Sequence, residues 1–122
     1  MAAQIQPLVG PIGGKVYTVT VANSTAIADP GGNPHVVYQI EFDNTANAAA
    51  AYLKMYGVAS PAHQTNAPIF TLRASAGTKE HMMFPAGTAF AFLSIIVTTV
   101  QDNTTVGPGS TANPTNVAVL YT

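Results

Sequence analysis

Apolar and polar residues alternate with a period of two along most of this chain, and that pattern restricts the fold more than any other feature. The clearest case is the segment His35–Asp43. Successive side chains of a β-strand point to opposite faces of its sheet, so this alternation predicts a strand with one face in the core. The predicted core face carries Val36, Tyr38, Ile40 and Phe42.

Further strands are predicted where β-branched and apolar residues recur between clusters of Pro, Gly, Asn and Asp. Their ranges are 15–22, 51–57, 69–74, 79–84, 89–100 and 116–121, with a marginal one at 4–9. Turns or loops are expected at 29–34, 60–61, 76–77, 85–87 and 101–114. The segment 89–100 reads as one long buried strand, because it falls short of the roughly 20 residues of a membrane helix.

About eight short strands in two antiparallel sheets are the number found in a jelly roll. We therefore predict an all-β chain with a single antiparallel β-sandwich of jelly-roll type, and an immunoglobulin-like sandwich as the alternative. A chain of 122 residues has room for one such core. Residues 15–122 are predicted to form this domain and residues 1–14 an extended N-terminal arm.

Charged residues are scarce, because the chain has only four Lys and Arg and five Asp and Glu residues, or 7%. A typical soluble domain carries about 25%. A surface with a net charge of −1 repels copies of itself only weakly, which favours a protein that packs closely in an assembly. Four dispersed cations cannot neutralise a run of phosphates, so we expect no nucleic-acid partner, and we expect no membrane partner either.

Several kinds of chemistry find no support in the sequence. The absence of cysteine excludes thiol catalysis and disulfides. His35, His63 and His81 have no metal-ligand spacing, and no Gly-x-Ser-x-Gly motif is present. The loops 29–33 and 101–104 each contain a single Asp and are better explained as turns than as calcium sites. We expect no enzyme, catalytic residue, metal or cofactor.

Tyr52, Lys54 and Tyr56 share one face of the strand predicted at 51–57, opposite Leu53 and Met55. An exposed ridge of this kind could bind protein or sugar, and it could equally be covered by the second sheet. The arm and the loop at 101–114 are rich in Gly and Pro and are candidates for reaching neighbouring molecules. The resulting candidate protein-interface residues are Ile5, Pro7, Leu8, Tyr52, Lys54, Tyr56, Asp102 and Asn103.

From residue 51 onward the chain resembles a type of small phage-encoded virion protein. The shared order begins with Ala51–Tyr56, a Pro-containing loop at 60–68 and a strand at 69–73. It continues with Phe84-Pro85-Ala86-Gly87, an aliphatic strand through Thr98, a loop at 101–105 and a final segment at 116–121. Together these pieces cover about 70 residues.

That resemblance implies a β-sandwich body and a role as a head decoration or cement protein on the exterior of a phage capsid. The implied partners are the major capsid protein and other copies of the chain, which we expect to form a homotrimer. The alternative function is a carbohydrate-binding or host-recognition module of a phage tail or head fibre.

Overall fold

The computed structural model describes residues 15–21, 34–102, 109 and 111–122, and in these residues it contains seven strands. None of the described residues forms a helix long and apolar enough to cross a membrane. The strands are β1 (Lys15–Val21), β2 (His35–Asp43), β3 (Ala51–Tyr56), β4 (Phe70–Ala74), β5 (Lys79–Phe90), β6 (Ser94–Thr98) and β7 (Thr115–Tyr121).

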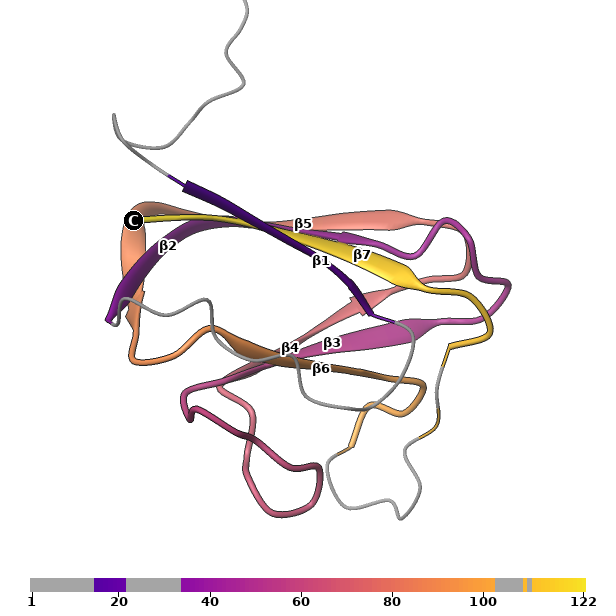
Figure 1. Ribbon diagram of the computed structural model, residues 1–122. Helices are drawn as coiled ribbons and strands as arrows, with labels where there is room; N and C mark the ends of the chain where they lie inside the picture. Colours follow the sequence, from indigo (N-terminus) through magenta and orange to yellow (C-terminus); the bar gives the residue numbers. More distant parts are fainter. Residues whose placement is uncertain (1–14, 22–33, 103–108, 110) are drawn as a thin grey trace, which may run out of the picture.

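The strands form two antiparallel sheets that face each other, so the predicted all-β sandwich is confirmed (Figure 1). The sheet orders are β1-β7-β2-β5 and β4-β3-β6. The pairs β1 with β7, β2 with β5 and β3 with β4 are nested along the chain, with each pair enclosing the next. A long hairpin rolled over on itself has this nesting, which is that of a jelly roll. In an immunoglobulin-like sandwich the first two strands are sheet neighbours, whereas here β7 separates β1 from β2.

The core lies between the two sheets and combines aliphatic side chains with several aromatic rings. One residue in two points inward on each strand, as the alternation predicts. The four-stranded sheet contributes Val37, Ile40, Phe42, Val117 and Val119, and the three-stranded sheet contributes Leu53, Met55, Ile95 and Val97. At one side, where the edge strands β4 and β5 approach each other, the core is closed by Phe70, Phe84 and Phe90, whose ring centroids lie 6.1–6.3 Å apart.

The predicted turn at 85–87 is wrong, because these residues continue β5 to Phe90. Gln39 pairs with Met83 and Val37 pairs with Thr88, so residues 84–87 form a bulge opposite Tyr38. Pro85 is tolerated there because a bulge on an edge strand needs no ladder hydrogen bond from that residue.

The predicted single strand at 89–100 is also wrong. Ala89 and Phe90 end β5, the chain then turns at residues 91–93, and β6 begins in the other sheet at Ser94. This continuous apolar run therefore contributes residues to strands in both sheets, because both of its parts are buried in the same core. The other boundaries agree with the prediction to within one residue, while the marginal strand at 4–9 and the arm at 1–14 lie outside the described residues.

Candidate interaction surface

The predicted ridge on β3 is not exposed. Tyr52, Lys54 and Tyr56 do share the face opposite Leu53 and Met55. However, Lys54 and Tyr56 have exposed fractions of 0%, and Tyr52 is half-buried. The side chains on the neighbouring strand β6 are buried as well. The chain itself therefore covers most of the outer face of β3 and β6, while Arg73 of β4 stays exposed.

Two contacts show how loops are held against this face. The Nζ atom of Lys54 donates a hydrogen bond to the main-chain oxygen of Asp102. The Oγ atom of Ser94 donates to the main-chain oxygen of Ala59 at 3.2 Å. Burial lowers the pKa of Lys54, an effect that the charge of Asp102 partly opposes, and burial raises the pKa of Tyr56. Both side chains thus belong to the packed interior and do not form a platform for a ligand.

Of the other predicted interface residues, Asp102 is exposed in the loop that follows β6. Ile5, Pro7, Leu8 and Asn103 lie outside the described residues. Two exposed aliphatic side chains, which the sequence analysis did not select, lie on this same side of the sandwich. Val58 is 38% exposed and lies near the start of the loop between β3 and β4. Ile69 is 54% exposed and lies at the end of this loop.

A row of four paired residues crosses the outer face of the four-stranded sheet, with an exposed apolar side chain at each end, and we call Val16, Leu120, Gln39 and Met83 the outer row. Leu120 of β7 is paired with Val16 of β1 on one side and with Gln39 of β2 on the other. Gln39 is in turn paired with Met83 of β5. Val16 is 63% exposed and Met83 is 50% exposed. The outer row therefore crosses the whole sheet with its two ends open to solvent.

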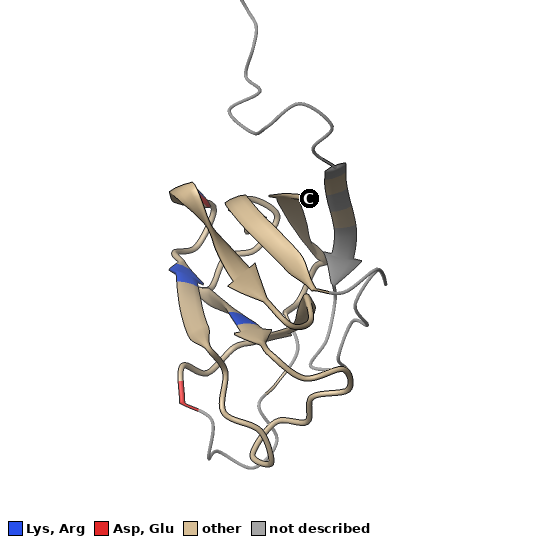
Figure 2. Cartoon of the chain, turned by 90° about the vertical axis from the view of Figure 1, so that its left-hand side faces the viewer, with Lys and Arg blue, Asp and Glu red and all other residues tan. Residues whose placement is uncertain are grey.

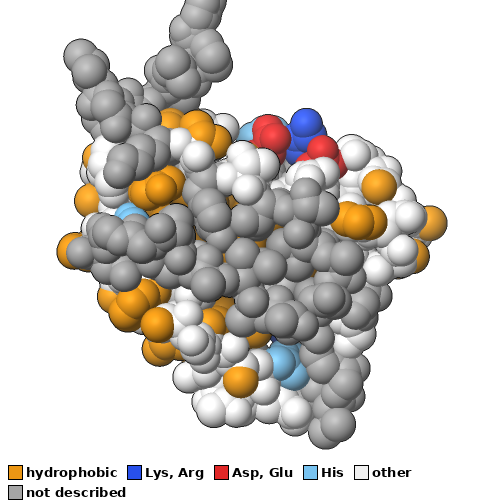
Figure 3. Space-filling view, in the orientation of Figure 1, with side chains coloured by type: hydrophobic (Ala, Val, Ile, Leu, Met, Phe, Trp, Pro, Cys, Tyr) orange, Lys and Arg blue, Asp and Glu red, His pale blue; other side chains and the backbone are white. Residues whose placement is uncertain are grey.

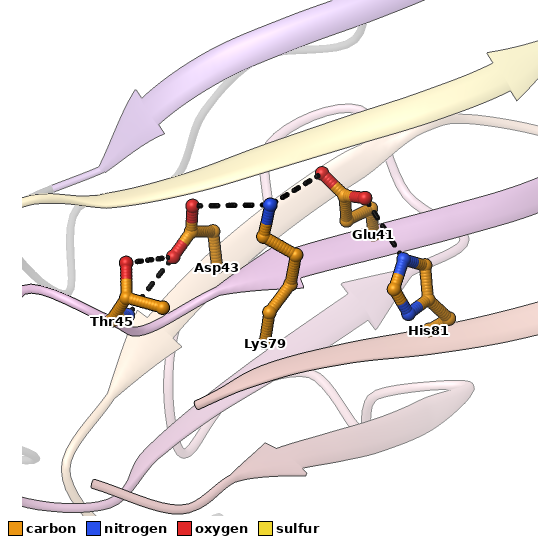
Figure 4. Close-up of polar contacts among 5 residues, drawn as sticks. All are labelled: Glu41, Asp43, Thr45, Lys79 and His81. Atoms are coloured by element: carbon orange, nitrogen blue, oxygen red, sulfur yellow. Dashed lines mark hydrogen bonds and ion pairs between the residues drawn. The ribbon is translucent and has the colours of Figure 1, made fainter. Parts of the chain in front are cut away.

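Charged side chains occupy the same face beside the outer row, but only on β2 and β5 (Figure 4). The Lys79 Nζ atom lies 3.8 Å from a carboxylate oxygen of Glu41 and 3.8 Å from one of Asp43. The His81 Nε2 atom lies 2.9 Å from the other carboxylate oxygen of Glu41. We call these four residues the charged cluster. Lys79 thus balances one of the two carboxylate charges within the chain, and His81 shares a hydrogen bond with Glu41.

Asp43 is further held by the turn that follows β2. Its Oδ1 atom accepts hydrogen bonds from the hydroxyl and from the main-chain N–H of Thr45 (Figure 4). These two bonds lower the pKa of Asp43 below its ordinary value, and the bond from the hydroxyl has the larger effect. The Asp43 carboxylate therefore stays ionised, and it stays in place beside Lys79.

Away from this cluster the described surface has few charges (Figure 2). In the view of Figure 3 the acidic and basic side chains gather at one edge, whereas histidine side chains are also seen away from it, and most of the other described side chains are apolar or uncharged. The fold thus brings several of the few charged residues of the chain together in the charged cluster. A surface without dispersed charge provides little electrostatic repulsion against a close neighbour.

An amide network joins three loops at one end of the sandwich. The Nδ2 atom of Asn44 donates to the main-chain oxygens of Ala49, Ala74 and Ser75. Asn47 donates from its Nδ2 atom to the Oδ1 atom of Asn44 at 2.9 Å. Asn44 and Asn47 have exposed fractions of 0% and 5%. Uncharged amides here fix the loops in the way that ion pairs often do on more highly charged domains.

A hollow of about 290 Å³ lies next to this network. It is lined by Asn47, Ala48, Ala49, Ala50, Thr99, Thr111 and Ala112. None of the lining residues is titratable, so the hollow offers packing surface and no acid, base or nucleophile. Among the described residues no group of three His, Cys, Asp or Glu side chains could hold a metal ion.

Sequence reasoning missed the outer row, the charged cluster and the amide network. The polar face of His35–Asp43 was visible as a pattern, but the pairing that aligns Glu41 with His81 depends on strand register. The asparagines at 44, 47 and 113 were one signal for the amide network, because buried loops need polar side chains that form hydrogen bonds with main-chain groups.

No protein-family model matches the chain, and no curated protein matches it. Among solved structures, one similarity is to a chain in the structure of infectious bursal disease virus Gx strain. The sequences are 15% identical, the match covers 88% of this chain and 32% of that chain, and the TM-score is 0.26. This chain thus spans about a third of the viral chain.

Proposed function

We propose that the chain is a phage capsid decoration protein, which binds the major capsid protein at the capsid exterior and acts without catalysis. The observation that carries the proposal is the surface itself. The charges are few, those of the charged cluster are partly balanced within it, and exposed apolar side chains lie on both outer sides of the sandwich. Such a surface suits permanent contact with protein neighbours. The order of sequence pieces shared with small phage virion proteins points in the same direction.

The side of the three-stranded sheet is the proposed contact with the capsid. The loop between β3 and β4 lies on that side (Figure 1), and Val58 and Ile69 near its two ends are exposed. The loop after β6 is held to the same side by the hydrogen bond from Lys54 to Asp102. The arm residues Ile5, Pro7 and Leu8 are proposed to extend this contact, because an uncharged segment with aliphatic residues gains from lying on an apolar surface. Repetition of a modest contact over a shell gives high total avidity without strong individual binding.

The alternative function, a carbohydrate-binding module, depended on an exposed platform of Tyr52, Lys54 and Tyr56. Lys54 and Tyr56 are fully buried, so this platform is unavailable to a sugar. No other group of exposed aromatic rings on the described residues takes its place. We therefore do not pursue this alternative.

The proposal is tested by counting copies of the chain in purified virions of the phage that encodes it. Quantitative mass spectrometry against the major capsid protein should find hundreds of copies. A dozen copies would place the chain at a vertex, fibre or tail, and complete absence would refute a structural role. In a second assay, purified chain is sedimented with shells stripped of it. Ile69→Glu should then reduce binding to shells, whereas Met83→Glu, of similar exposure on the opposite side, should not.

A further inference from the structure

The two sheets end in four edge strands, which are β1 and β5 in one sheet and β4 and β6 in the other. An edge strand carries main-chain N–H and C=O groups with which a further strand can pair. Proteins prevent such pairing by covering the edge, or by placing a proline, a bulge or a charged side chain on it. The four edges of this sandwich differ in these respects.

Three of the four edges are protected. The strand β6 is covered, because every one of its residues is buried. The strand β5 contains a bulge, and Pro85 lies within it. The strand β4 has only five residues, carries the exposed Arg73, and lies beside β5 where the rings of Phe70 and Phe84 are 6.1 Å apart. A neighbouring strand therefore finds no long, regular row of accessible main-chain groups on these edges.

The remaining edge strand, β1, has none of these protections. It pairs with β7 over seven consecutive residues without a shift of register. It contains no proline, and its one charged residue is Lys15 at its start. No described strand pairs with its other edge. Val16 is 63% exposed and Thr18 is also exposed. Among the described strands, β1 is therefore the edge that is regular, accessible and almost uncharged.

We propose that β1 binds β1 of a second copy in antiparallel orientation, about a two-fold axis at Thr18, so that the two four-stranded sheets become one continuous sheet. A second copy fits this edge because it offers the same unprotected row of main-chain groups. The described part of the chain has one such edge, so the pairing uses both open edges and closes after two copies. A chain with two open edges would extend into a filament instead.

An axis at Thr18 is the register that pairs all seven residues of β1. Thr18 of one copy then lies opposite Thr18 of the other, and Thr–Thr pairs across strands are favourable. Lys15 lies opposite Val21, so the two lysines are at opposite ends of the contact, about 20 Å apart. Glu41 and Asp43 lie on β2, and five strand spacings, or about 24 Å, separate β2 of one copy from β2 of the other. No like charges are brought together.

Main-chain hydrogen bonds, more than buried area, hold this contact. Strand addition to a sheet edge takes its affinity from such bonds, and an antiparallel pair makes about one for each of the seven residues. The interface is small and belongs to the transient class. We therefore expect a monomer–dimer equilibrium that shifts with concentration. A homotrimer, which the sequence resemblance implies, does not follow from a single edge that pairs with itself.

Single cysteines test the axis, since the native chain contains none. Thr18→Cys places two cysteines directly opposite each other, with Cα atoms about 4.5–5.5 Å apart, which suits a disulfide. Val16→Cys is the matched control on the same exposed side of β1, because its two copies lie about 14 Å apart. After mild oxidation, non-reducing electrophoresis should show a covalent dimer for Thr18→Cys and little for Val16→Cys. Equal yields, or no dimer from Thr18→Cys, would overturn the proposed axis.

Charges at Thr18 provide an independent test by sedimentation equilibrium of the full chain. Thr18→Lys and Thr18→Glu each place like charges opposite one another, so either variant alone should dimerise severalfold more weakly than the native chain. An equimolar mixture of the two should recover dimerisation, because opposite charges then face each other. Met83→Lys, at an exposed site on the other edge strand of the sheet, should dimerise like the native chain.

A native chain that stays monomeric or forms a trimer would refute the pairing, and so would a mixture that associates no better than its components. Shells are absent from both experiments. Failure here therefore leaves the decoration role to be judged by the binding of the chain to shells.

Discussion

Asn47 and Asn113 hold each other by two hydrogen bonds across the end of the sandwich. The Nδ2 atom of Asn47 donates to the main-chain oxygen of Asn113 at 3.0 Å, and its Oδ1 atom accepts from the main-chain N–H of Asn113 at 2.7 Å. One buried side chain thus satisfies both main-chain groups of a residue in the loop before β7. This contact links that loop to the turn after β2.

Asn47→Ala should lower the free energy of unfolding by about 2 kcal/mol, because the part-buried main-chain N–H of Asn113 and the buried Oδ1 atom of Asn44 lose their partners, while the main-chain oxygen of Asn113 keeps only its bond from Thr111. Urea denaturation monitored by circular dichroism measures the change. Asn66→Ala is the control. Its side chain accepts a hydrogen bond from the main-chain N–H of Ala62 in an exposed loop, so the loss should stay below about 1 kcal/mol. Equal losses at the two sites would show that the amide network stabilises the fold no more than an exposed loop contact does.

Gly87→Ala should destabilise the chain by about 2–4 kcal/mol, because an unfavourable backbone conformation and a clash act together. Gly87 has a φ of +79°, and a Cβ atom there would lie 2.6 Å from Val36 Cγ1 and 2.9 Å from Tyr38 Cε1. Gly77 has a similar φ of +67°, but a Cβ atom would meet nothing within 4 Å. Gly77→Ala should therefore cost only about 1 kcal/mol, and thermal unfolding of the two variants separates the clash from the backbone term.

Lys54→Met should stabilise the chain by on the order of 1 kcal/mol at pH 7, because a buried ammonium group is replaced by an apolar side chain of similar length. The pKa of Lys54 is lowered in the folded state, so the unfolded state binds more protons between the folded and the ordinary value. Stability of the native chain relative to Lys54→Met should therefore rise as the pH increases toward 10.5. A difference that does not change with pH would contradict this account.

The pKa of Tyr56 is raised by burial, which predicts the opposite trend above its ordinary value of 10.0. There the unfolded state loses its proton first, so the native chain should lose stability as the pH rises further. Tyr56→Phe should remove this alkaline loss. Chemical denaturation of the native chain, Lys54→Met and Tyr56→Phe between pH 7 and 11 distinguishes the two contributions.

Thr45→Val should raise the pKa of Asp43 toward its ordinary value, because the hydroxyl of Thr45 is the main cause of the lowering. Carboxyl ¹³C NMR titration reports this pKa directly. The folded pKa is depressed, so the stabilisation by Asp43 is present above pH 3.8 and is lost as the pH falls through the folded value. Thr111→Val, which removes a hydroxyl that donates to a main-chain oxygen, should leave the titration of Asp43 unchanged.

Strand positions could be predicted from the sequence where one face of a strand is buried and the other is polar. The segment His35–Asp43 was predicted with its observed limits, since Ile40 and Phe42 face the core while Glu41 and Asp43 face outward. Its bulge reverses the prediction at one end, because Val37 and not Val36 or Tyr38 is the buried residue there. Tyr38 is the extra residue of this bulge and shifts the alternation of β2 by one position. The position of the shift could not be seen in the sequence, because Val36, Val37 and Tyr38 are all apolar.

The surface was harder to predict than the core. Lys54 and Tyr56 have the spacing of an exposed face, and only the three-dimensional path of the loops covers them. The outer row depends on register, since Val16 and Met83 come from strands at opposite edges of the sheet. Alternation in one segment identifies which residues share a face, but it does not say what lies next to that face.

The pairing of Lys15 with Tyr121 places the start of β1 beside the end of β7, within the spacing of two neighbouring strands. Main-chain hydrogen bonds between Thr122 and Val36 hold the chain at the end of β7 against β2. A short peptide could therefore join the two points, and the chain could be reopened in the exposed loop at Gln64, which has a φ of +73°. Such a circularly permuted form would present both of its ends on the side of the three-stranded sheet, where a fused cargo would sit away from the outer row.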